Sequence, residues 1–185
     1  VASKNISPLT NVFFTDSFVG SSNSIKVFSL MDSKKDLKKI TASSEFTFLK
    51  ILNSLRHIER GYSEVKRGKW RENESYMRGR QLNSKNIGLI GLGRIGKNIA
   101  KWSAAFGASV HYYDPFVFNK KFKKISIKKI FSQSDIICLC CTYNKYTHNL
   151  INYDLLNQMK KNTILINTSR GEIINEKSLI NLIKK

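Results

Sequence analysis

Residues 87–96 read IGLIGLGRIG, an apolar run that ends in three glycines at the spacing Gly-x-Gly-x-x-Gly. A run without charges, 87–90, is typical of a short strand that is buried on both faces. Residues 95–106 are predicted to form a helix. The glycine turn is therefore predicted to lie between a strand and a helix, which is the context of a dinucleotide-binding turn.

Each glycine of the turn has its own predicted role. Gly91 permits a tight turn, and Gly93 lets the main chain approach a pyrophosphate without a Cβ atom in the way. Gly96 lets the helix pack closely against the strand. The unpaired N–H groups of Arg94 and Ile95 at the start of the helix would then face the phosphates. An ordinary strand-to-helix turn is the alternative interpretation of the same pattern.

Asp114 strengthens the dinucleotide interpretation. It follows a second predicted strand, 109–113, and comes 18 residues after Gly96, close to the spacing of about 20 for a carboxylate that accepts hydrogen bonds from the adenosine ribose. This carboxylate would repel a 2′-phosphate, and no arginine follows at once to bind one, so the sequence favours NAD over NADP. The alternative is that Asp114 is only a turn residue before Pro115.

Strands and helices alternate through the rest of the chain. Further strands are predicted at 124–127, 136–141 and 163–168, with helices at 128–132, at 153–159 and from the N-cap Asn175 to 183. This order predicts right-handed crossovers and a doubly wound α/β fold, in which helices cover both faces of a parallel sheet.

The region before the glycine turn has a weaker pattern. A strand is predicted at 25–30, followed by a helix that Ser43 or Ser44 caps and that runs to about residue 61. Residues 62–85 are charged and are predicted to form a connecting arm in which an aromatic residue, Trp70, docks on the domain.

The net charge of +19 raises the question of a nucleic-acid partner. The lysines form doublets that fall on different predicted elements, are interpreted as lacking interleaved aromatic residues, and match no nucleic-acid-binding motif. The doublets are Lys34-Lys35, Lys38-Lys39, Lys120-Lys121, Lys123-Lys124, Lys128-Lys129 and Lys160-Lys161. A solvated lysine-rich surface is the commoner explanation. A nucleic-acid partner is therefore not expected. No apolar run approaches the about 20 residues that span a bilayer, so the sequence predicts a soluble, cytoplasmic protein without a membrane partner.

The three cysteines lie together in the predicted strand 136–141. There Cys138, Cys140 and Cys141 are expected to act as small buried side chains. Neighbours on a strand point to opposite faces, and no histidine or second cysteine pair stands at ligand spacing, so no metal site is predicted. Their odd number argues against a disulfide framework.

Residues 40–185 resemble the nucleotide-binding half of the D-isomer-specific 2-hydroxyacid dehydrogenases. The most specific match is the segment Ile166-Asn167-Thr168-Ser169-Arg170-Gly171. Other matching segments follow in the family's order: Ser44-Glu45-Phe46-Thr47, Gly68 and Trp70, Gly91 to Gly96, Tyr113-Asp114-Pro115, Ser134-Asp135, Thr147 with Leu150-Ile151-Asn152, and Met159-Lys160-Lys161. The resemblance implies a Rossmann-type domain that binds NAD and an oxidoreductase that transfers hydride between NAD(H) and a small 2-hydroxy acid.

The resemblance also implies that Arg170 is the catalytic arginine that holds the substrate carboxylate and polarises the carbonyl oxygen. A planar guanidinium stays charged and can hold a carboxylate through two parallel hydrogen bonds, which suits a 2-oxo acid. An Arg-Gly pair that only starts a turn is the alternative. Besides the three glycines, the family's cofactor contacts carry over to Arg94, Ile95, Asp114, Cys141, Thr142, Thr147, Thr168 and Ser169.

The sequence departs from the family's pattern at several places. Thr142 stands where a proline is usual, and Asn175 stands where an aspartate commonly follows the Arg-Gly pair. In the family a histidine paired with a glutamate donates the proton to the developing alkoxide further along the chain, and the sequence stops before both. The three histidines, His57, His111 and His148, are expected to be structural or exposed.

The resemblance and these departures together predict how the chain is divided into domains. Residues 1–40 are expected to be the remnant of a substrate domain and hinge, and residues 41–185 an NAD-binding domain cut short at its C-terminus, which is expected to be inactive by itself. In the family the nucleotide domains build a dimer, so the resemblance implies a homodimer with helix 44–60 and arm 62–76 as interface. The alternative function is a non-enzymatic, NAD-binding dimeric interaction module.

Overall fold

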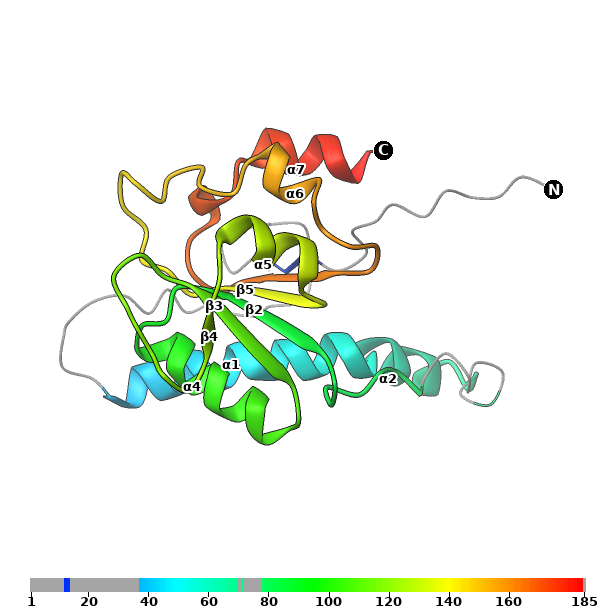
Figure 1. The fold of residues 1–185 in the computed structure, drawn as a ribbon. Helices are drawn as coiled ribbons and strands as arrows, with labels where there is room; N and C mark the ends of the chain where they lie inside the picture. Colours follow the sequence, from blue (N-terminus) through cyan, green and yellow to red (C-terminus); the bar gives the residue numbers. More distant parts are fainter. Residues whose placement is uncertain (1–11, 14–36, 70, 72–77, 185) are drawn as a thin grey trace.

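Six parallel strands form one sheet at the centre of the molecule (Figure 1). The computed structural model describes residues 12–13, 37–69, 71 and 78–184. The strands are β1 (Val12–Phe13), β2 (Asn86–Ile90), β3 (Ser109–Tyr113), β4 (Lys123–Lys124), β5 (Ile136–Leu139) and β6 (Ile164–Asn167), and they lie in the order β1-β6-β5-β2-β3-β4. The helices are α1 (Leu37–Arg56), α2 (Ile58–Lys66), α4 (Arg94–Ala105), α5 (Ile127–Gln133), α6 (Tyr153–Leu156) and α7 (Glu176–Ile183), with a 3₁₀ turn at Gly171–Ile173.

Helices cover both faces of this sheet. Because successive strand residues point to opposite faces, Leu89 of β2 packs under α1 and α4, whereas its neighbour Ile90 packs under α5, α6 and α7. Figure 1 shows α1 and α4 below the sheet and α5, α6 and α7 above it. The two hydrophobic cores confirm the predicted doubly wound α/β fold, in which β5 and β6 are buried on both faces.

The strand order places a reversal point between β2 and β5. From β2 the chain builds outward through β3 to β4, and it then returns to the other side of β2 to form β5 and β6. In open α/β sheets, ligands bind at the carboxyl ends of the strands beside such a reversal. This edge, where the glycine turn follows β2, is therefore the place to look for a functional site.

Most predicted elements are present with small shifts at their ends. The strand predicted at 109–113 has these bounds, and Asn175 caps α7 because its side chain accepts a hydrogen bond from the Ser178 N–H at 2.9 Å. The strand expected at 124–127 is reduced to the two residues of β4, and α5 begins at Ile127 instead. The predicted strand 25–30 and Trp70 lie outside the described residues.

The start of the long N-terminal helix was wrongly predicted. Ser43 and Ser44 do not cap it, because α1 already begins at Leu37. The hydroxyl of Ser44 donates to the Ile40 carbonyl at 2.7 Å and accepts from the Asn98 amide at 3.1 Å. A serine inside a helix is tolerated when its hydroxyl returns to the preceding turn in this way. Here the second bond also ties α1 to α4.

The charged arm predicted at 62–85 was only partly right, because its first residues belong to helix α2. His57 has a left-handed backbone, with φ of 53°, and separates α1 from α2. Ile58, Tyr62 and Val65 of α2 recur at helical spacing on one side, and each is more than half exposed. This stripe, rather than charge, is the pattern that identifies the helix.

The boundary between two domains that was expected at residue 40 stays a prediction, although α1 runs across it and β1 pairs with β6 in the same sheet.

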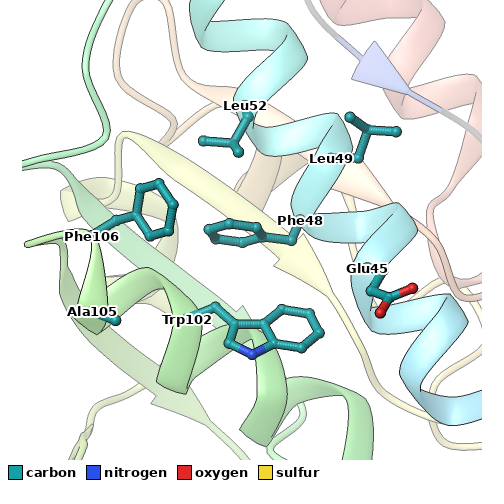
Figure 2. A pocket seen from close by; sticks show the side chains of 7 residues that line it. All are labelled: Glu45, Phe48, Leu49, Leu52, Trp102, Ala105 and Phe106. Carbon is teal, nitrogen blue, oxygen red and sulfur yellow. The ribbon is translucent and has the colours of Figure 1, made fainter.

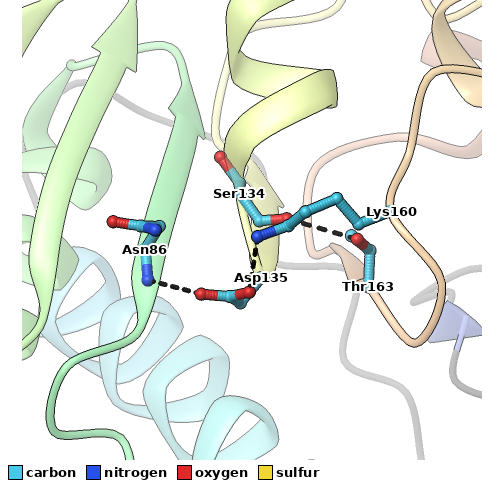
Figure 3. A network of polar contacts seen from close by, with 5 residues as sticks. All are labelled: Asn86, Ser134, Asp135, Lys160 and Thr163. Atoms are coloured by element: carbon cyan, nitrogen blue, oxygen red, sulfur yellow. Dashed lines mark hydrogen bonds and ion pairs between the residues drawn. The ribbon is translucent and has the colours of Figure 1, made fainter.

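At the opposite edge of the sheet from the glycine turn, Asp135 joins three parts of the fold (Figure 3). One carboxylate oxygen accepts from the Asn86 N–H at 2.8 Å, and the other binds the Lys160 ammonium at 2.6 Å. None of the described helices is both long and apolar enough to cross a membrane.

Candidate functional site

The glycine turn begins with a residue that only glycine can supply. Gly91 has φ of 95°, a conformation that strains any residue with a Cβ atom. A Cβ atom there would also lie 2.8 Å from both the main-chain nitrogen and the Cα of Cys141. The Gly91 N–H donates to the Tyr113 carbonyl at 2.8 Å. The turn is therefore packed against the ends of both β3 and β5.

The other two glycines differ in their surroundings. A Cβ atom on Gly96 would overlap the carbonyl oxygen of Gly91, so glycine is needed here for α4 to approach the turn. Gly93, by contrast, has no heavy atom within 4 Å of its Cβ position and has an ordinary φ of −71°. Neither packing nor backbone conformation demands glycine at Gly93. The physical effect of glycine at this position is to leave open space outside the turn, which a side chain would otherwise fill.

Helix α4 presents free main-chain donors to that space. The first hydrogen bond of the helix runs from the Lys97 N–H to the Gly93 carbonyl at 3.0 Å. In the described part of the chain, nothing accepts a hydrogen bond from the N–H groups of Arg94 and Ile95. The helix dipole adds a partial positive charge at this end, and the Arg94 side chain is exposed. The arrangement suits a phosphate or another anion.

Asp114 lies at the end of β3 and is almost completely buried, with 9% of its surface exposed. One carboxylate oxygen accepts from the Leu92 N–H at 2.8 Å, and the other accepts from the N–H groups of Phe116 and Val117 at 2.9 and 3.0 Å. Asp114 therefore holds the glycine turn and the loop after β3 together. The oxygen that binds Leu92 keeps a further lone pair for another donor.

Two hydroxyl side chains directly after β6, those of Thr168 and Ser169, have fixed partners. Thr47 of α1 and Thr168 are joined through their hydroxyls at 2.7 Å. Because the single hydroxyl proton of Thr47 is donated to the Ser43 carbonyl at 2.8 Å, Thr168 must be the donor of that bond. The Ser169 hydroxyl donates to the Cys141 carbonyl and so joins β6 to β5.

Arg170 follows β6 directly at the same edge of the sheet. Its main chain is extended, and its carbonyl accepts from the Asn167 amide at 2.8 Å. Its side chain is half-buried, and among the described residues no carboxylate lies within ion-pair distance of its guanidinium. A guanidinium held at a site without a protein counter-ion is suited to bind an anionic ligand.

The loop after β5 lies beside Arg170. The Asn149 N–H donates to the carbonyl of Glu172 at 2.8 Å, which anchors the loop next to the 3₁₀ turn. The Thr147 hydroxyl is turned into its own loop, where it donates to the Thr142 carbonyl at 2.9 Å and accepts from the Asn144 N–H at 2.8 Å. Thr147 therefore fixes the loop's shape.

The histidines lie in different parts of the fold. His148 is exposed in this loop, between the Tyr143 hydroxyl at 3.3 Å and the Asn149 amide at 3.0 Å. His57 separates two helices, and His111 lies within β3. Burial, with the charges of Arg80 and Arg60, lowers the pKa of His57; burial and Lys123 lower that of His111.

The cysteines differ more in exposure than was predicted. Cys138 is buried, but Cys140 and Cys141 are only half-buried because they follow the end of β5. Burial raises the pKa of Cys138 to about 12, and burial together with the Asp114 charge raises the pKa of Cys141 to about 11. These thiols therefore stay neutral at physiological pH. No group of three potential metal ligands occurs among the described residues.

The structure thus gathers the predicted site residues at one edge, although their contacts with a cofactor stay predictions. The glycine turn, Asp114, the end of β5 and the Thr168–Arg170 segment are joined there by the hydrogen bonds above. Thr47 and Asn167 were missed as positioning residues. Thr47 had a signal, because it is a polar residue among the apolar positions of α1 and stands three residues after Ser44.

Comparison with known proteins gives a consistent match over this region. Residues 48–185 match the family described as D-isomer specific 2-hydroxyacid dehydrogenase, NAD binding domain. D-3-phosphoglycerate dehydrogenase of Bacillus subtilis is 36% identical over 144 residues, which are 75% of this chain and 27% of that protein. 2-Hydroxyacid dehydrogenase A of Aspergillus oryzae is 36% identical over 147 residues, 77% of this chain and 42% of that protein.

Solved structures agree in fold. D-lactate dehydrogenase from Aquifex aeolicus, complexed with NAD and lactic acid, has a TM-score of 0.74 and 31% identity over 78% of this chain and 44% of that chain. NAD-dependent formate dehydrogenase from Staphylococcus aureus, in complex with NAD, has a TM-score of 0.70 and 32% identity over 77% of this chain and 44% of that chain. The chain spans less than half the length of these relatives.

Proposed function

The chain belongs to the D-isomer specific 2-hydroxyacid dehydrogenase family, through the family's NAD binding domain, and from this premise we propose that it binds NAD(H) for hydride transfer to and from a small 2-hydroxy acid. The observation that carries the proposal is the open space beside Gly93, faced by the free N–H groups at the start of α4. The predicted cofactor residues fit NAD at this edge of the sheet.

Each part of the dinucleotide has a proposed place. The N–H groups of Arg94 and Ile95, which face the open space at Gly93, would hold the pyrophosphate. The free lone pair of Asp114 would accept a hydrogen bond from a hydroxyl of the adenosine ribose. The residues proposed to surround the nicotinamide are Cys141, Thr142, Thr147, Thr168 and Ser169.

Arg170 is the proposed substrate-binding residue. Its guanidinium holds the carboxylate of a 2-oxo acid through two hydrogen bonds and draws electron density from the adjacent carbonyl oxygen. Bound NADH supplies the hydride that the carbonyl carbon accepts. The extended main chain at Arg170, fixed through Asn167, keeps the side chain at the carboxyl edge of the sheet.

Fluorescence titration with NADH tests the proposal. We expect saturable binding by the full chain, and we expect Arg170→Gln to leave NADH affinity unchanged but to abolish binding of glyoxylate or pyruvate to the NADH complex. Arg56→Gln, which removes the same charge at the end of α1, is the control. Absence of NADH binding by a folded protein would refute the cofactor site, and unchanged 2-oxo acid binding by Arg170→Gln would refute the role of Arg170.

We also propose that the chain forms a homodimer through α1 and α2. A hollow of about 380 Å³ lies between α1 and α4. Figure 2 shows the side chains that line it: Glu45, Phe48, Leu49, Leu52, Trp102, Ala105 and Phe106. Leu49 and Phe106 are 54% and 52% exposed, and the stripe on α2 adds further apolar surface. Apolar residues gathered in this way are typical of interfaces.

The exposed stripe also favours the second candidate function, a non-enzymatic NAD-binding dimeric interaction module. Analytical sedimentation with and without NADH tests the homodimer and the NAD-binding interaction module. We expect a dimer that Leu49→Glu or Val65→Glu dissociates, with Ile180→Glu on α7 as the matched control, since Ile180 is also partly exposed. A monomer at every concentration would refute the dimer. The cytoplasmic location expected from the sequence stays a prediction.

A further inference from the structure

The segment 115–129, directly after Asp114, has an unusual composition. It contains six lysines and no carboxylate. Two of its phenylalanines are exposed, with 94% of the surface of Phe116 and 77% of that of Phe118 open to solvent. The segment forms the loop after β3, then edge strand β4 and the start of α5. It is called the Phe-Lys segment below.

The loop that carries the two rings has fixed geometry. Its N–H groups at Phe116 and Val117 are bound by Asp114, and the N–H of Asn119 donates to the Tyr112 hydroxyl at 2.9 Å. Val117 packs against the core between the two phenylalanines. Since the residue between them points inward, both rings are held outward from a supported main chain.

Protection of the sheet edge explains only part of this surface. Lysines on an edge strand prevent pairing with another chain, and this accounts for Lys123 and Lys124 of β4. It does not account for two rings exposed on an ordered loop. Burial of each ring against a partner would be favourable, so the two rings together mark a candidate interaction surface.

We propose that the Phe-Lys segment binds single-stranded nucleic acid, with bases stacked on Phe116 and Phe118 and phosphates along the lysines. Proteins that bind single strands combine aromatic side chains, on which bases stack, with positive charges along the backbone. The lysines stand close to the rings: Lys120 and Lys121 follow Phe118 in the loop, and the Lys124 ammonium of β4 donates to the Val117 carbonyl, between the two rings, at 3.2 Å. Positive charges beside exposed rings can bind the phosphates of nucleotides whose bases stack on those rings.

This proposal reverses the expectation from the sequence. That expectation treated the lysine doublets as dispersed because they fall on different elements. The structure places three of them on successive exposed pieces of chain that begin beside two exposed rings. An anionic membrane is the competing partner, but the rings lie on a loop beside an edge strand and not on an amphipathic helix of the kind that lies in a membrane interface.

Fluorescence anisotropy of the full chain with a fluorescein-labelled 12-nucleotide oligo(dT), and with oligo(U), tests the proposal. For four phosphates neutralised by the lysines of the loop and β4, we expect the logarithm of affinity to fall with the logarithm of salt concentration with a slope of about −3. The pair Lys120→Ala and Lys121→Ala is expected to reduce the slope by about 1.4. The pair Lys161→Ala and Lys177→Ala, on other elements, is the charge control.

Leucine at the two ring positions separates stacking from insertion. Phe116→Leu and Phe118→Leu keep the apolar volume but remove the ring, so each is expected to weaken oligonucleotide binding by at least about 5-fold. Circular dichroism verifies folding, which the exposed positions should not affect. Unchanged oligonucleotide affinity in both leucine variants would overturn the proposal. So would binding of phosphatidylserine vesicles, retained by the leucine variants, without binding of either oligonucleotide.

Discussion

Alanine substitution of two neighbouring glycines is expected to separate folding from cofactor binding. At Gly91, a Cβ atom meets main-chain atoms of Cys141 at 2.8 Å, and φ is 95°. At Gly93, two residues later, the Cβ position is open and φ is −71°. Gly91→Ala should therefore destabilise the protein, whereas Gly93→Ala should leave it folded but unable to bind NADH well.

The structure gives the size of each effect. The left-handed conformation costs Gly91→Ala about 1–2 kcal/mol, and the forced contacts with Cys141 cost about 1–3 kcal/mol more. A loss of about 3 kcal/mol lowers Tm by about 6–12 °C for a chain of this length. Gly93→Ala loses only the advantage of glycine at the N-cap of α4, about 1 kcal/mol or less.

The cofactor should respond in the opposite order. A methyl group on Gly93 fills space proposed for the pyrophosphate, so we expect NADH affinity to fall at least about 10-fold, which corresponds to about 1.4 kcal/mol. Thermal unfolding and NADH fluorescence titration measure the two quantities on the same samples. Wild-type NADH affinity in Gly93→Ala would refute the placement of the pyrophosphate. Wild-type stability in Gly91→Ala would refute the packing argument.

Three further predictions concern stability. Burial raises the pKa of Asp135, but the hydrogen bond from the Asn86 N–H and the Lys160 ammonium outweigh this effect and hold the pKa below its ordinary value. The ionised carboxylate therefore stabilises the folded protein at neutral pH, and this stabilisation is lost as the pH falls through the folded-state pKa. Lys160→Met should lower stability at pH 7 by about 1 kcal/mol and flatten this acid dependence in urea unfolding; an equally steep profile would contradict the pairing. Asn175→Ala removes the N-cap of α7 and should cost about 1 kcal/mol in the same assay; no loss would mean that the cap is not stabilising. Thr47→Val should cost about 1 kcal/mol because Thr168 loses its acceptor, and a Thr47→Ser variant that restores stability would confirm the hydroxyl as the cause.

Local features of the fold were well predicted from the sequence. The glycine turn needs only a short apolar strand, three glycines and a helix, all of which are adjacent in the chain. Asn175 was identified as an N-cap for the same reason, because the partner of its side chain is the Ser178 N–H three residues away. A feature whose interacting residues lie within a few positions of one another can be predicted from the sequence without the rest of the fold.

Features that depend on distant partners were predicted less well. Ser44 has the chemistry of a cap, but its partners are Ile40 and the remote Asn98, and the helix extends past it. Asp114 was expected to bind a ligand or to act as a turn residue before Pro115, and its hydrogen bond from the Leu92 N–H across the glycine turn was not predicted. The exposure of Phe116 depends on the loop that Tyr112 and Asn119 support, and composition alone does not show it.

The hydroxyl pair of Thr47 and Thr168 joins two surfaces with different proposed tasks. The outer side of α1 is the proposed dimer surface, whereas Arg170, two residues after Thr168, is the proposed substrate-binding residue. In the proposed dimer, a shift of α1 would reach the end of β6 through this 2.7 Å hydrogen bond. Thr47→Val removes the bond but leaves the exposed side of α1 unchanged, so it should leave association intact while uncoupling it from substrate binding.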